Sequence, residues 1–359
     1  MPVVLLLEGV RREQVQVRLS PLAELCATLH ALADPDHHPA SGQWAASTRA
    51  EAPAELVAGC DEWAPLYGAL RAQYFYPTVG GAAEDLDTEM ARIAALGMGD
   101  FVDMTAAAIL GRRRECTPAG PLREEWARRR FLEAARHASP HRHALAQRLA
   151  DDPSGFRDRL VGFLRTFAEQ VFQTLWARHR PALQAELHAR RLDLHNRELG
   201  ALSSLAPGIS EFQQPHRLVF DKLYQAVIRL GDRPLLLLPS AHGAPHLVIK
   251  HQPGLPVSIQ FPLVRQTAQP AFPQVQERLK ALTDPNRLAV CRAVVREPAT
   301  TVDIAANTGM TEPQVSRHLR RLRDTGLVHR EREGRLVFYS LNTEALSRLG
   351  LDLLDTMRR

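Results

Sequence analysis

Residues 311–326 read TEPQVSRHLRRLRDTG and show the clearest helix pattern in the C-terminal part of the chain. Thr311 followed three residues later by Gln314 is a capping-box pattern, which predicts that a helix begins here. Gly326 stands where a left-handed C-terminal cap is expected. The apolar residues of this helix fall within about 60° of one another on a helical wheel: Val315, Leu319 and Leu322. The pattern predicts a helix that packs through one narrow apolar side.

The side opposite these apolar residues is rich in hydrogen-bond donors. Gln314, Arg317 and Arg321 lie roughly opposite, while Ser316 and Arg320 lie on one flank and His318 on the other. Side chains of this kind can bind base edges and phosphates in a DNA major groove. The sequence therefore predicts a recognition helix. We expect base contacts from Gln314, Ser316 and Arg317, and backbone contacts from Thr311, His318, Arg320 and Arg321.

The flanking residues complete a winged helix-turn-helix pattern. Upstream, two helices hinged at Asp284-Pro285 are predicted, and a short helix is expected between Thr300, with Asp303 in a capping position, and Gly309. Downstream, residues 327–332 and 335–341 predict two strands joined by a tight turn at 333–334. The arginines of this hairpin are expected to contact the flanking DNA backbone or minor groove: Arg330, Arg332 and Arg335.

Residues 275–341 resemble the ArsR-type transcriptional regulators. The resemblance is carried by LKALTDPNRL at 279–288, VSRHLRRLRDTGLV at 315–328 and VFY at 337–339. It implies a homodimer that binds double-stranded operator DNA at a near-palindromic site and represses until an effector loosens it. It also implies dimer contacts from the helix at 275–282 and from a terminal helix at 343–359. The apolar residues of the terminal helix agree with this, although packing within one monomer explains them nearly as well: Leu346, Leu349, Leu353 and Leu354.

The N-terminal part carries a second resemblance. Residues 33–39 (ADPDHHP) with Trp44, and residues 234–240 (PLLLLPS), resemble an uncharacterised domain that precedes this DNA-binding module in some bacterial regulators. This resemblance implies an architecture and no ligand.

The charge distribution agrees with a basic module attached to a near-neutral body. The 359 residues have a formal net charge of +5, and residues 275–359 hold 15 Lys and Arg against 11 Asp and Glu. An arginine-rich solvated helix would explain the same asymmetry, so the charge alone is weak support. The apolar run at 2–7 is too short for a membrane span and no basic residue precedes it, so a cytoplasmic, nucleoid-associated protein without membrane contact is expected. The four cysteines are widely spaced and predict isolated reduced thiols.

The predicted fold class is α+β with two domains. Residues 1–266 are expected to form an N-terminal effector or interaction domain, helical to about residue 205 with an antiparallel meander over 209–263. In it, Ser20-Pro21 should start a helix that ends near Ala33, residues 36–81 should be loop-rich, and Pro181 should interrupt or kink a long helix that passes through 160–175. Residues 267–274 are the predicted linker, and residues 275–359 the winged helix-turn-helix domain with its terminal dimerisation helix.

Metal and cofactor sites are not predicted. Thiolate sensors of the resembling family carry a cysteine pair on or beside the first helix of the motif, where this chain reads TTVDIAA at 300–306, and residues 343–359 contain neither His nor Cys. His137 and His141 have the i, i+4 spacing of a zinc pair, with His143 nearby, but Pro140 interrupts them and no carboxylate or cysteine joins them. His37 and His38 are interpreted as turn residues, and Cys291 as a small core residue.

No catalytic motif is present either, since the chain lacks G-x-S-x-G, a Gly-rich phosphate loop and H-E-x-x-H. The prediction is a non-enzyme that responds to a non-metal, small organic effector. The alternative is an enzyme or ligand-binding module whose C-terminal domain serves dimerisation or autoregulation. Five aromatic residues are candidates for an apolar effector pocket, with ordinary core packing as the more frequent explanation: Trp44, Trp63, Tyr67, Tyr74 and Tyr76.

Overall fold

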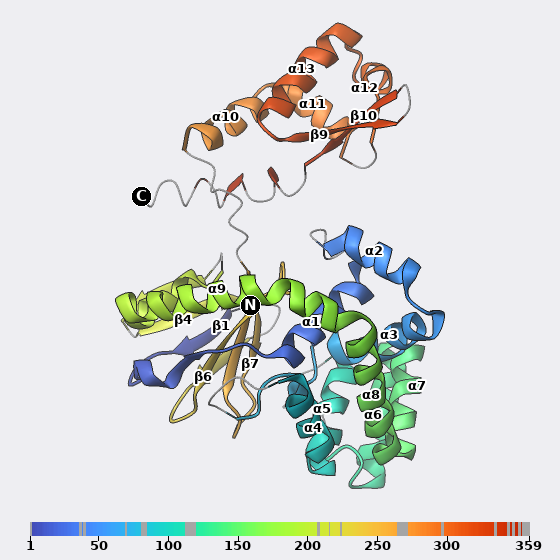
Figure 1. The fold of residues 1–359 in the computed structure, drawn as a ribbon, viewed down its shortest axis with the longest axis vertical. Helices are drawn as coiled ribbons and strands as arrows, with labels where there is room; N and C mark the ends of the chain where they lie inside the picture. The colour runs from blue at the N-terminus through green and yellow to red at the C-terminus, as the bar shows by residue number, and fades with distance from the viewer. Residues whose placement is uncertain are drawn as a thin grey trace. The chain divides into compact units, whose positions relative to one another are not determined.

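A computed structural model gives the architecture of the chain (Figure 1). It describes residues 2–35, 38, 41–68, 70–79, 85–111, 120–206, 209–214, 216–222, 225–263, 272–295, 298–333, 336–342, 345–346, 349–350 and 353. By its internal contacts the chain divides into two compact units, Met1–Val264 and Arg265–Arg359. Of the linker predicted at 267–274, residues 267–271 lie outside the described residues. A helix starts at Phe272, so the last three residues of the predicted linker belong to this helix.

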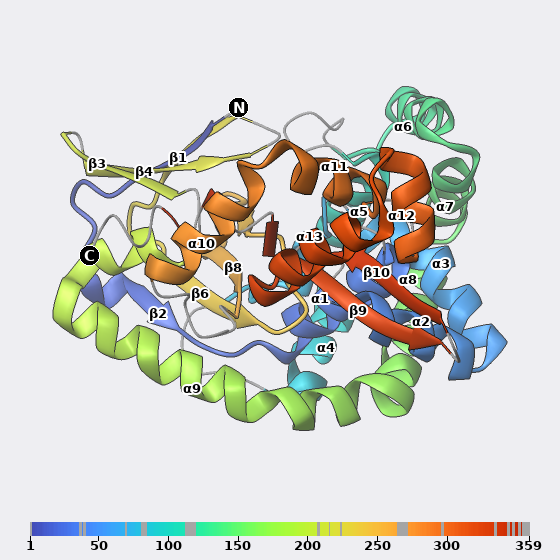
Figure 2. The same cartoon turned by 90° about the horizontal axis from the view of Figure 1, so that it is seen from above.

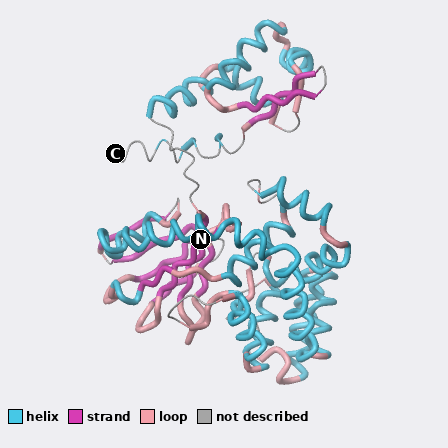
Figure 3. The backbone as a smooth tube through the Cα atoms, viewed as in Figure 1, coloured by secondary structure: helices cyan, strands magenta, loops and turns pink. Residues whose placement is uncertain are grey.

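The N-terminal unit contains most of the helices. Its α-helices are α1 Pro21–Ala33, α2 Gly42–Glu51, α3 Ala54–Tyr67, α4 Leu86–Ala95, α5 Met98–Leu110, α6 Glu125–Ala138, α7 Pro140–Asp151, α8 Pro153–Phe167 and α9 Gln173–Arg197. Shorter helical turns are η1 Arg12–Gln14, η4 Gln73–Phe75, η6 Ala168–Phe172 and η7 Glu198–Ser204. Helices α3 to α8 gather beside the strands (Figure 3). Helix α9 runs on from this bundle along the strands and contacts two of them (Figure 2).

The start of α1 follows from two residues that the sequence singles out. The Ser20 hydroxyl accepts a hydrogen bond from the backbone N–H of Ala23, and Pro21 occupies the first helical position, where its missing N–H costs nothing. The helix ends at Ala33, before Asp34-Pro35. The predicted helix over these residues is confirmed.

The prediction of a loop-rich segment over 36–81 is wrong, because α2 and α3 occupy much of it. Pro53 stands at the N-cap of α3, so it starts this helix, and Pro65 lies in its last turn. The prolines and aromatic residues that suggested loops are therefore compatible with helix at these places.

The long helix predicted through 160–175 is present with one irregularity. Helix α8 continues through a π-helical turn, η6, into α9, and the predicted buried face includes Leu160, Leu164 and Phe172. Pro181 lies inside α9, which runs on to Arg197 without interruption. The predicted break at Pro181 is therefore wrong, although a bend remains compatible with the continuous helix.

The strands form two four-stranded sheets in the N-terminal unit. They are β1 Pro2–Leu6, β2 Val15–Val17, β3 Ile209–Gln213, β4 His216–Asp221, β5 Ala226–Arg229, β6 Leu235–Ser240, β7 Val248–Lys250 and β8 Val257–Pro262. The first sheet has the order β3-β4-β1-β5 and the second the order β2-β6-β8-β7. In register, Leu5 pairs with Leu218 of β4 and with Ile228 of β5.

The predicted antiparallel meander is corrected by this topology. The expected strands exist, but β1–β5, β2–β6 and β6–β8 are parallel pairs, and both sheets include a strand from the first 17 residues. Apolar runs separated by turn residues locate strands but do not say which strands pair. The α+β class stands, with mixed sheets in place of an antiparallel one.

Strand β6 joins the two hydrophobic cores of the N-terminal unit. All six of its residues are buried, which is typical of a strand covered on both faces. Leu236 and Leu238 pack with the helical core around α1, α3, α5 and α8, whereas Leu235 and Leu237 pack with the core that lies against α9. Among the described residues, no single helix is long and apolar enough to span a membrane. Helices α4 and α5 reach that length and apolar content only when taken together, and the chain bends by 105° between them.

The C-terminal unit contains α10 Phe272–Leu282, α11 Pro285–Ala293, α12 Thr301–Thr308, α13 Glu312–Asp324, β9 Val328–Glu333 and β10 Leu336–Leu341. Strands β9 and β10 form an antiparallel hairpin, and a bridge between Ala299 and Tyr339 attaches the chain before α12 to it.

Candidate nucleic-acid interface

The helices of the C-terminal unit begin and end at residues with clear capping chemistry. The Asp284 carboxylate accepts hydrogen bonds from the backbone N–H groups of Asn286 and Arg287 at the start of α11. At α12, Thr300 and Asp303 form a capping box, and Gly309 follows with φ +70°. Gly326, with φ +72°, ends the turn after α13. A residue with a Cβ adopts this left-handed conformation only at a cost. The predicted cap at Gly326 and the predicted end of α12 before Gly309 are therefore confirmed.

One apolar side of α13 seats it in the domain core. Val315, Leu319 and Leu322 are at most 1% exposed and pack with Ile304 of α12 and Val290 of α11. Cys291, which is 4% exposed, belongs to the same core, as expected for a small apolar residue. The predicted apolar side is therefore confirmed, and the rest of α13 faces away from this core.

The residues predicted to contact DNA lie mostly on this outer surface. Seven of the ten are exposed: Thr311, Gln314, Ser316, Arg317, Arg320, Arg321 and Arg330. His318 is half-buried. The side chain of Arg332 and all of Arg335 lie outside the described residues, as does the turn at 334–335. The fold therefore brings the six exposed residues of the α13 region together on one surface, with Arg330 on the adjoining strand β9.

Gln314 has a structural role that the sequence already indicates. Its side-chain oxygen accepts hydrogen bonds from the Thr311 backbone N–H at 2.9 Å and from the Thr311 hydroxyl at 3.1 Å. The capping box predicted for these two residues is thus present, and it fixes the orientation of the Gln314 amide at the start of the helix. Any contact of Gln314 with a base would come from the amide nitrogen of a side chain already held in place.

One of the predicted DNA-contacting residues, Arg321, also binds a charged group inside the unit. Arg321 forms an ion pair with Glu277, which connects α13 to α10. A hydrogen bond from Lys280 and, after it, the charges of Lys280 and Arg321 lower the pKa of Glu277 below its usual value. At the start of α11, the backbone N–H of Arg287 and, after it, the charge of Arg287 lower the pKa of Asp284. The ion pair of Arg321 therefore helps to hold α13 against α10.

The residues proposed for a dimer contact are partly within the described structure. Val275 and Ala281 on α10 are fully buried, Leu349 is 7% exposed and Leu346 is 36% exposed. Leu354 and most of 343–359 lie outside the described residues.

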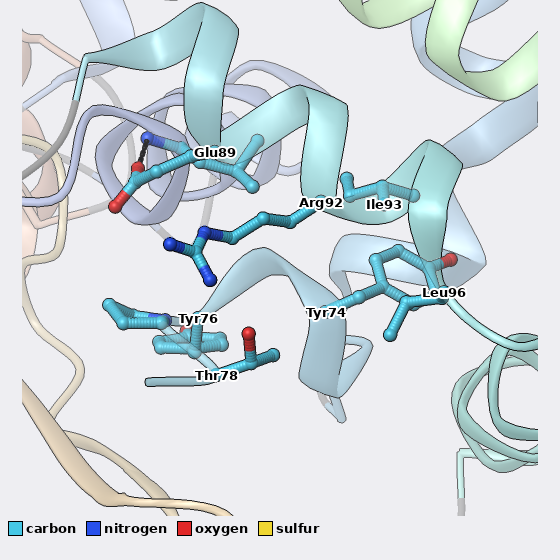
Figure 4. Close-up of a pocket in the computed structure, with 9 residues that line it drawn as sticks. Tyr74, Tyr76, Thr78, Glu89, Arg92, Ile93 and Leu96 are labelled. Carbon is cyan, nitrogen blue, oxygen red and sulfur yellow. Dashed lines mark hydrogen bonds between the residues drawn. The ribbon is translucent and has the colours of Figure 1, made fainter. Parts of the chain in front are cut away.

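The aromatic residues predicted as an effector pocket lie in the helical core of the N-terminal unit. Trp63, Tyr67, Tyr74 and Tyr76 are at most 4% exposed, and Trp44 is half-buried, with its ring 5.0 Å from that of His242. Tyr74 and Tyr76 line a cavity together with Glu89, Arg92 and Ile93 (Figure 4). Its volume of about 10 Å³ is near what a single water requires. Core packing explains the burial of these residues, and their role in an effector pocket stays a prediction.

The histidines at 137–143 are each bound to a different backbone carbonyl. His137 Nδ1 lies 2.8 Å from the carbonyl oxygen of Glu133, and His141 Nε2 lies 2.9 Å from that of Glu62. His143 Nδ1 lies 3.2 Å from the carbonyl oxygen of Leu132. Pro140 starts α7, so His137 and His141 stand on separate helices. The structure does not gather these three rings around one point.

A helix, a short turn, a second helix with an outward donor-rich side and a β-hairpin define a winged helix-turn-helix module of the ArsR type. In agreement, residues 282–331 match a helix-turn-helix domain model. Residues 1–267 match the model described as a family of unknown function (DUF5937). Because this match covers most of the chain, the protein belongs to that family.

Several regulators are similar to the C-terminal module. The transcriptional repressor SmtB homolog of Synechocystis is 36% identical over 85 residues, which are 24% of this chain and 64% of that protein. The HTH-type transcriptional regulator NmtR of Mycobacterium tuberculosis is 41% identical over 71 residues, 20% of this chain and 59% of that protein. YgaV of Escherichia coli, also an HTH-type transcriptional regulator, is 31% identical, and the match covers 22% of this chain and 81% of that protein. The chain thus spans less than two thirds of the first two relatives.

Among solved structures, a homodimeric winged helix-turn-helix DNA-binding domain from Mycobacterium bovis is 31% identical. The match covers 22% of this chain and 74% of that chain, with a TM-score of 0.21.

Proposed function

We propose that this protein is a DNA-binding transcriptional repressor, and not an enzyme, that binds a near-palindromic operator as a homodimer. The observation that carries the proposal is the outer surface of α13, where exposed Ser316, Arg317 and Arg320 lie away from the three residues that seat the helix in its core. The similarity of the C-terminal module to transcriptional regulators and repressors supports the same function.

In this proposal α13 is the recognition helix. Gln314, Ser316 and Arg317 contact base edges, while Thr311, His318, Arg320 and Arg321 position the helix on the DNA backbone. The wing arginines Arg330, Arg332 and Arg335 contact the flanking backbone or minor groove. In a homodimer, two such helices enter successive major grooves about 10 bp apart, which makes the operator near-palindromic.

The dimer contact is proposed to come from α10 and the residues at 343–359. The exposed fraction of Leu346, 36%, supports a further apolar contact at that place. The boundaries proposed for the chain are an N-terminal domain at 1–266, a linker at 267–274 and the DNA-binding domain at 275–359. The protein would act in the cytoplasm, at the nucleoid.

The N-terminal domain is proposed to receive a small organic effector and to change the spacing of the two recognition helices. The two positions where sensors of the ArsR type hold metals, the first helix of the motif and the terminal helix, contain neither Cys nor His in this sequence. The effector is therefore placed in the domain of unknown function and not in the winged helix-turn-helix module.

The test is a fluorescence-anisotropy titration of the full chain with the DNA upstream of its own gene and with a scrambled duplex of equal length. We expect the upstream DNA to bind about 10³-fold more tightly or better at physiological salt. A double variant, Arg317→Ala with Arg320→Ala, should lose this preference and keep the wild-type circular dichroism. If folded wild-type protein binds neither duplex at low salt, the regulator function is wrong.

A further inference from the structure

Three histidine rings that are far apart in the sequence meet in the N-terminal unit. His30 lies near the end of α1, His38 follows this helix, and His246 lies between β6 and β7. Their ring centroids are 4.7 Å apart for His30 and His38, 5.1 Å for His30 and His246, and 5.0 Å for His38 and His246. His38 is fully buried, His30 is 7% exposed and His246 is half-buried. We refer to these residues as the His30 cluster.

The nitrogen atoms of the His30 cluster have the spacing of a metal site. One nitrogen of each ring lies within 4.8 Å of the corresponding nitrogens of the other two. The Nε2 atoms of His30 and His246 are 3.3 Å apart. Two imidazole nitrogens that bind one Zn²⁺ at 2.0–2.1 Å in tetrahedral geometry are about 3.3 Å apart. One pair thus has the required separation, and the third ring has to move by roughly 1.5 Å at most.

His38 is oriented as metal-binding histidines usually are. Its Nδ1 lies 2.6 Å from the carbonyl oxygen of Ala244 and donates its proton to it. This bond assigns the hydrogen to Nδ1 and leaves the lone pair of the ring on Nε2. A histidine that binds a metal through one nitrogen commonly donates the other N–H to a carbonyl or carboxylate, which fixes the ring and raises its basicity.

The loop that carries Ala244 and His246 is itself held firmly on α1. The buried carboxylate of Glu24 accepts hydrogen bonds from the Ser240 hydroxyl at 2.6 Å and from the His242 backbone N–H at 3.0 Å. The His242 ring also contacts Glu24, at 2.9 Å. Further along, the His246 N–H donates to the Gly243 carbonyl at 2.7 Å. Two turns of α1 thus fix the loop and present His30 to it, so the cluster is ordered by the same contacts that build the core.

The arrangement differs from an ordinary packed histidine. A buried polar ring is usually satisfied by one or two neutral partners. Here three imidazoles converge, and each pair can share only one proton between facing nitrogens. A cation at the centre can bind three such lone pairs at once, and imidazole ligands suit Zn²⁺ and neighbouring divalent ions such as Co²⁺ and Ni²⁺.

From this geometry we propose that His30, His38 and His246 form a divalent transition-metal site of the zinc type in the domain of unknown function. Three protein ligands leave one position of a tetrahedral ion for a water or another small ligand. The site lies outside the first helix of the motif and the terminal helix, the two segments without Cys or His in which sensors of the ArsR type hold metals.

The test is metal binding by the untagged full chain after treatment with a chelator. Titration with Co²⁺ should give the visible absorption of a tetrahedral ion at one equivalent per chain, and Zn²⁺ should displace it. Zn²⁺ should also raise the melting temperature of the wild type, since it binds only the folded site. Binding without the tetrahedral spectrum, or at a stoichiometry far from one, would contradict the proposed site.

Variants locate the site. His246→Gln is the main variant because this residue is half-buried and the change keeps most of its volume; His30→Ala and His38→Ala are the others. Each should weaken Zn²⁺ binding by more than about tenfold, since even partners of the ligands contribute 10–100-fold. The matched control, His137→Ala, changes an exposed histidine bound to a helix carbonyl and should bind Zn²⁺ as the wild type does.

The folded state of each variant is checked by its melting curve without metal. If His246→Gln melts cooperatively and still binds one Zn²⁺ with wild-type affinity, the proposal is overturned. It is also overturned if the folded wild type takes up no Zn²⁺.

Discussion

Helices α1 and α13 have the same length and opposite surroundings. Every residue of α1 from Pro21 to Leu32 is buried, whereas α13 buries only Val315, Leu319 and Leu322. Polar side chains on α1 therefore bind other parts of the protein, and many on α13 remain in contact with solvent. The difference separates residues whose loss should weaken the fold from residues whose loss should weaken binding of a partner.

The polar groups of α1 hold the second sheet against the helices. Glu24 binds the loop after β6, and Gln260 of β8 donates to the carbonyl of Ala23 at 3.0 Å. Gln260 also accepts a hydrogen bond from Arg71 at 2.9 Å. A buried polar network of this kind stabilises a fold when each member is bonded and costs much when one is removed.

The largest effect is expected from Glu24→Ala. The change leaves buried donors at Ser240 and His242, and a part-buried donor at Ala241, without their acceptor; each buried donor costs about 1–3 kcal/mol. We expect the free energy of unfolding of the N-terminal unit to fall by about 4 kcal/mol or more. All four tryptophans lie in this unit, so their fluorescence in a urea titration measures it. The control is Glu51→Ala, which changes an exposed residue at the end of α2. An equal decrease in the free energy of unfolding in both variants would contradict the stabilising role of the Glu24 hydrogen bonds.

Leu319→Ala tests the buried side of α13. Leu319 is 1% exposed, and such a truncation costs about 3 kcal/mol, within a range of 2–5. Hydrogen exchange of peptides from 285–341 in the full chain should become faster, while exchange in the N-terminal unit stays as in the wild type. Val302→Ala, a change on α12 at a residue 57% exposed, should alter exchange little. A comparable acceleration in both variants would contradict the assigned core.

Arg317→Ala tests the outer side of the same helix. It should weaken binding to the operator by about 1–3 kcal/mol and relax specificity at one position, with the free energy of unfolding changed by less than about 0.5 kcal/mol. Anisotropy titrations with specific and scrambled duplexes measure the first effect. Arg323→Ala, which removes an exposed arginine next to Asp324 on the same helix, should bind as the wild type. Equal loss on both duplexes would assign Arg317 to phosphate contacts.

The smallest effect is expected from Arg330→Ala on the wing. If Arg330 neutralises one phosphate, the slope of log affinity against log salt should decrease in magnitude by about one unit. Titrations at four salt concentrations measure the slope, with exposed Arg292→Ala on α11 as the control. An unchanged slope would exclude Arg330 from the interface.

Features of the fold that depend on neighbouring residues could be predicted from the sequence. Ser20-Pro21, Thr300 with Asp303, and Thr311 with Gln314 each begin a helix where the pattern places it. A cap joins residues that are three or four positions apart, so a short segment of the sequence contains both hydrogen-bonding partners. The pairing of strands depends on residues about 200 positions apart, and no local pattern carries that information. For this reason the sequence does not predict the parallel pairs β1–β5 and β2–β6, whose partners are more than 200 positions apart. The parallel pair β6–β8 is shorter in range, but β7, between them in sequence, lies at the edge of the sheet, an order that turn residues alone do not indicate.

The same distinction applies to the sites. The apolar and donor-rich sides of α13 depend only on the spacing of residues within one helix, so the sequence predicts them. The His30 cluster joins residues 216 positions apart, and the local sequence around His38 indicates only a turn residue. A local signal near the cluster is the resemblance of residues 33–39 and 234–240 to the same uncharacterised domain, since the first segment contains His38 and the second ends shortly before His246.

The place of β1 also has a consequence for synthesis of the chain. Leu6 pairs with Arg217, so β1 leaves the ribosome roughly 200 residues before its partner, a delay of about 10–40 s at elongation rates of about 5–20 residues per second. Contacts of such high sequence separation slow folding, and the N-terminal unit can close only when β8 has emerged. The DNA-binding module follows directly after β8, and its helices make contacts over short distances in sequence. The two units are therefore expected to complete their folding close together in time.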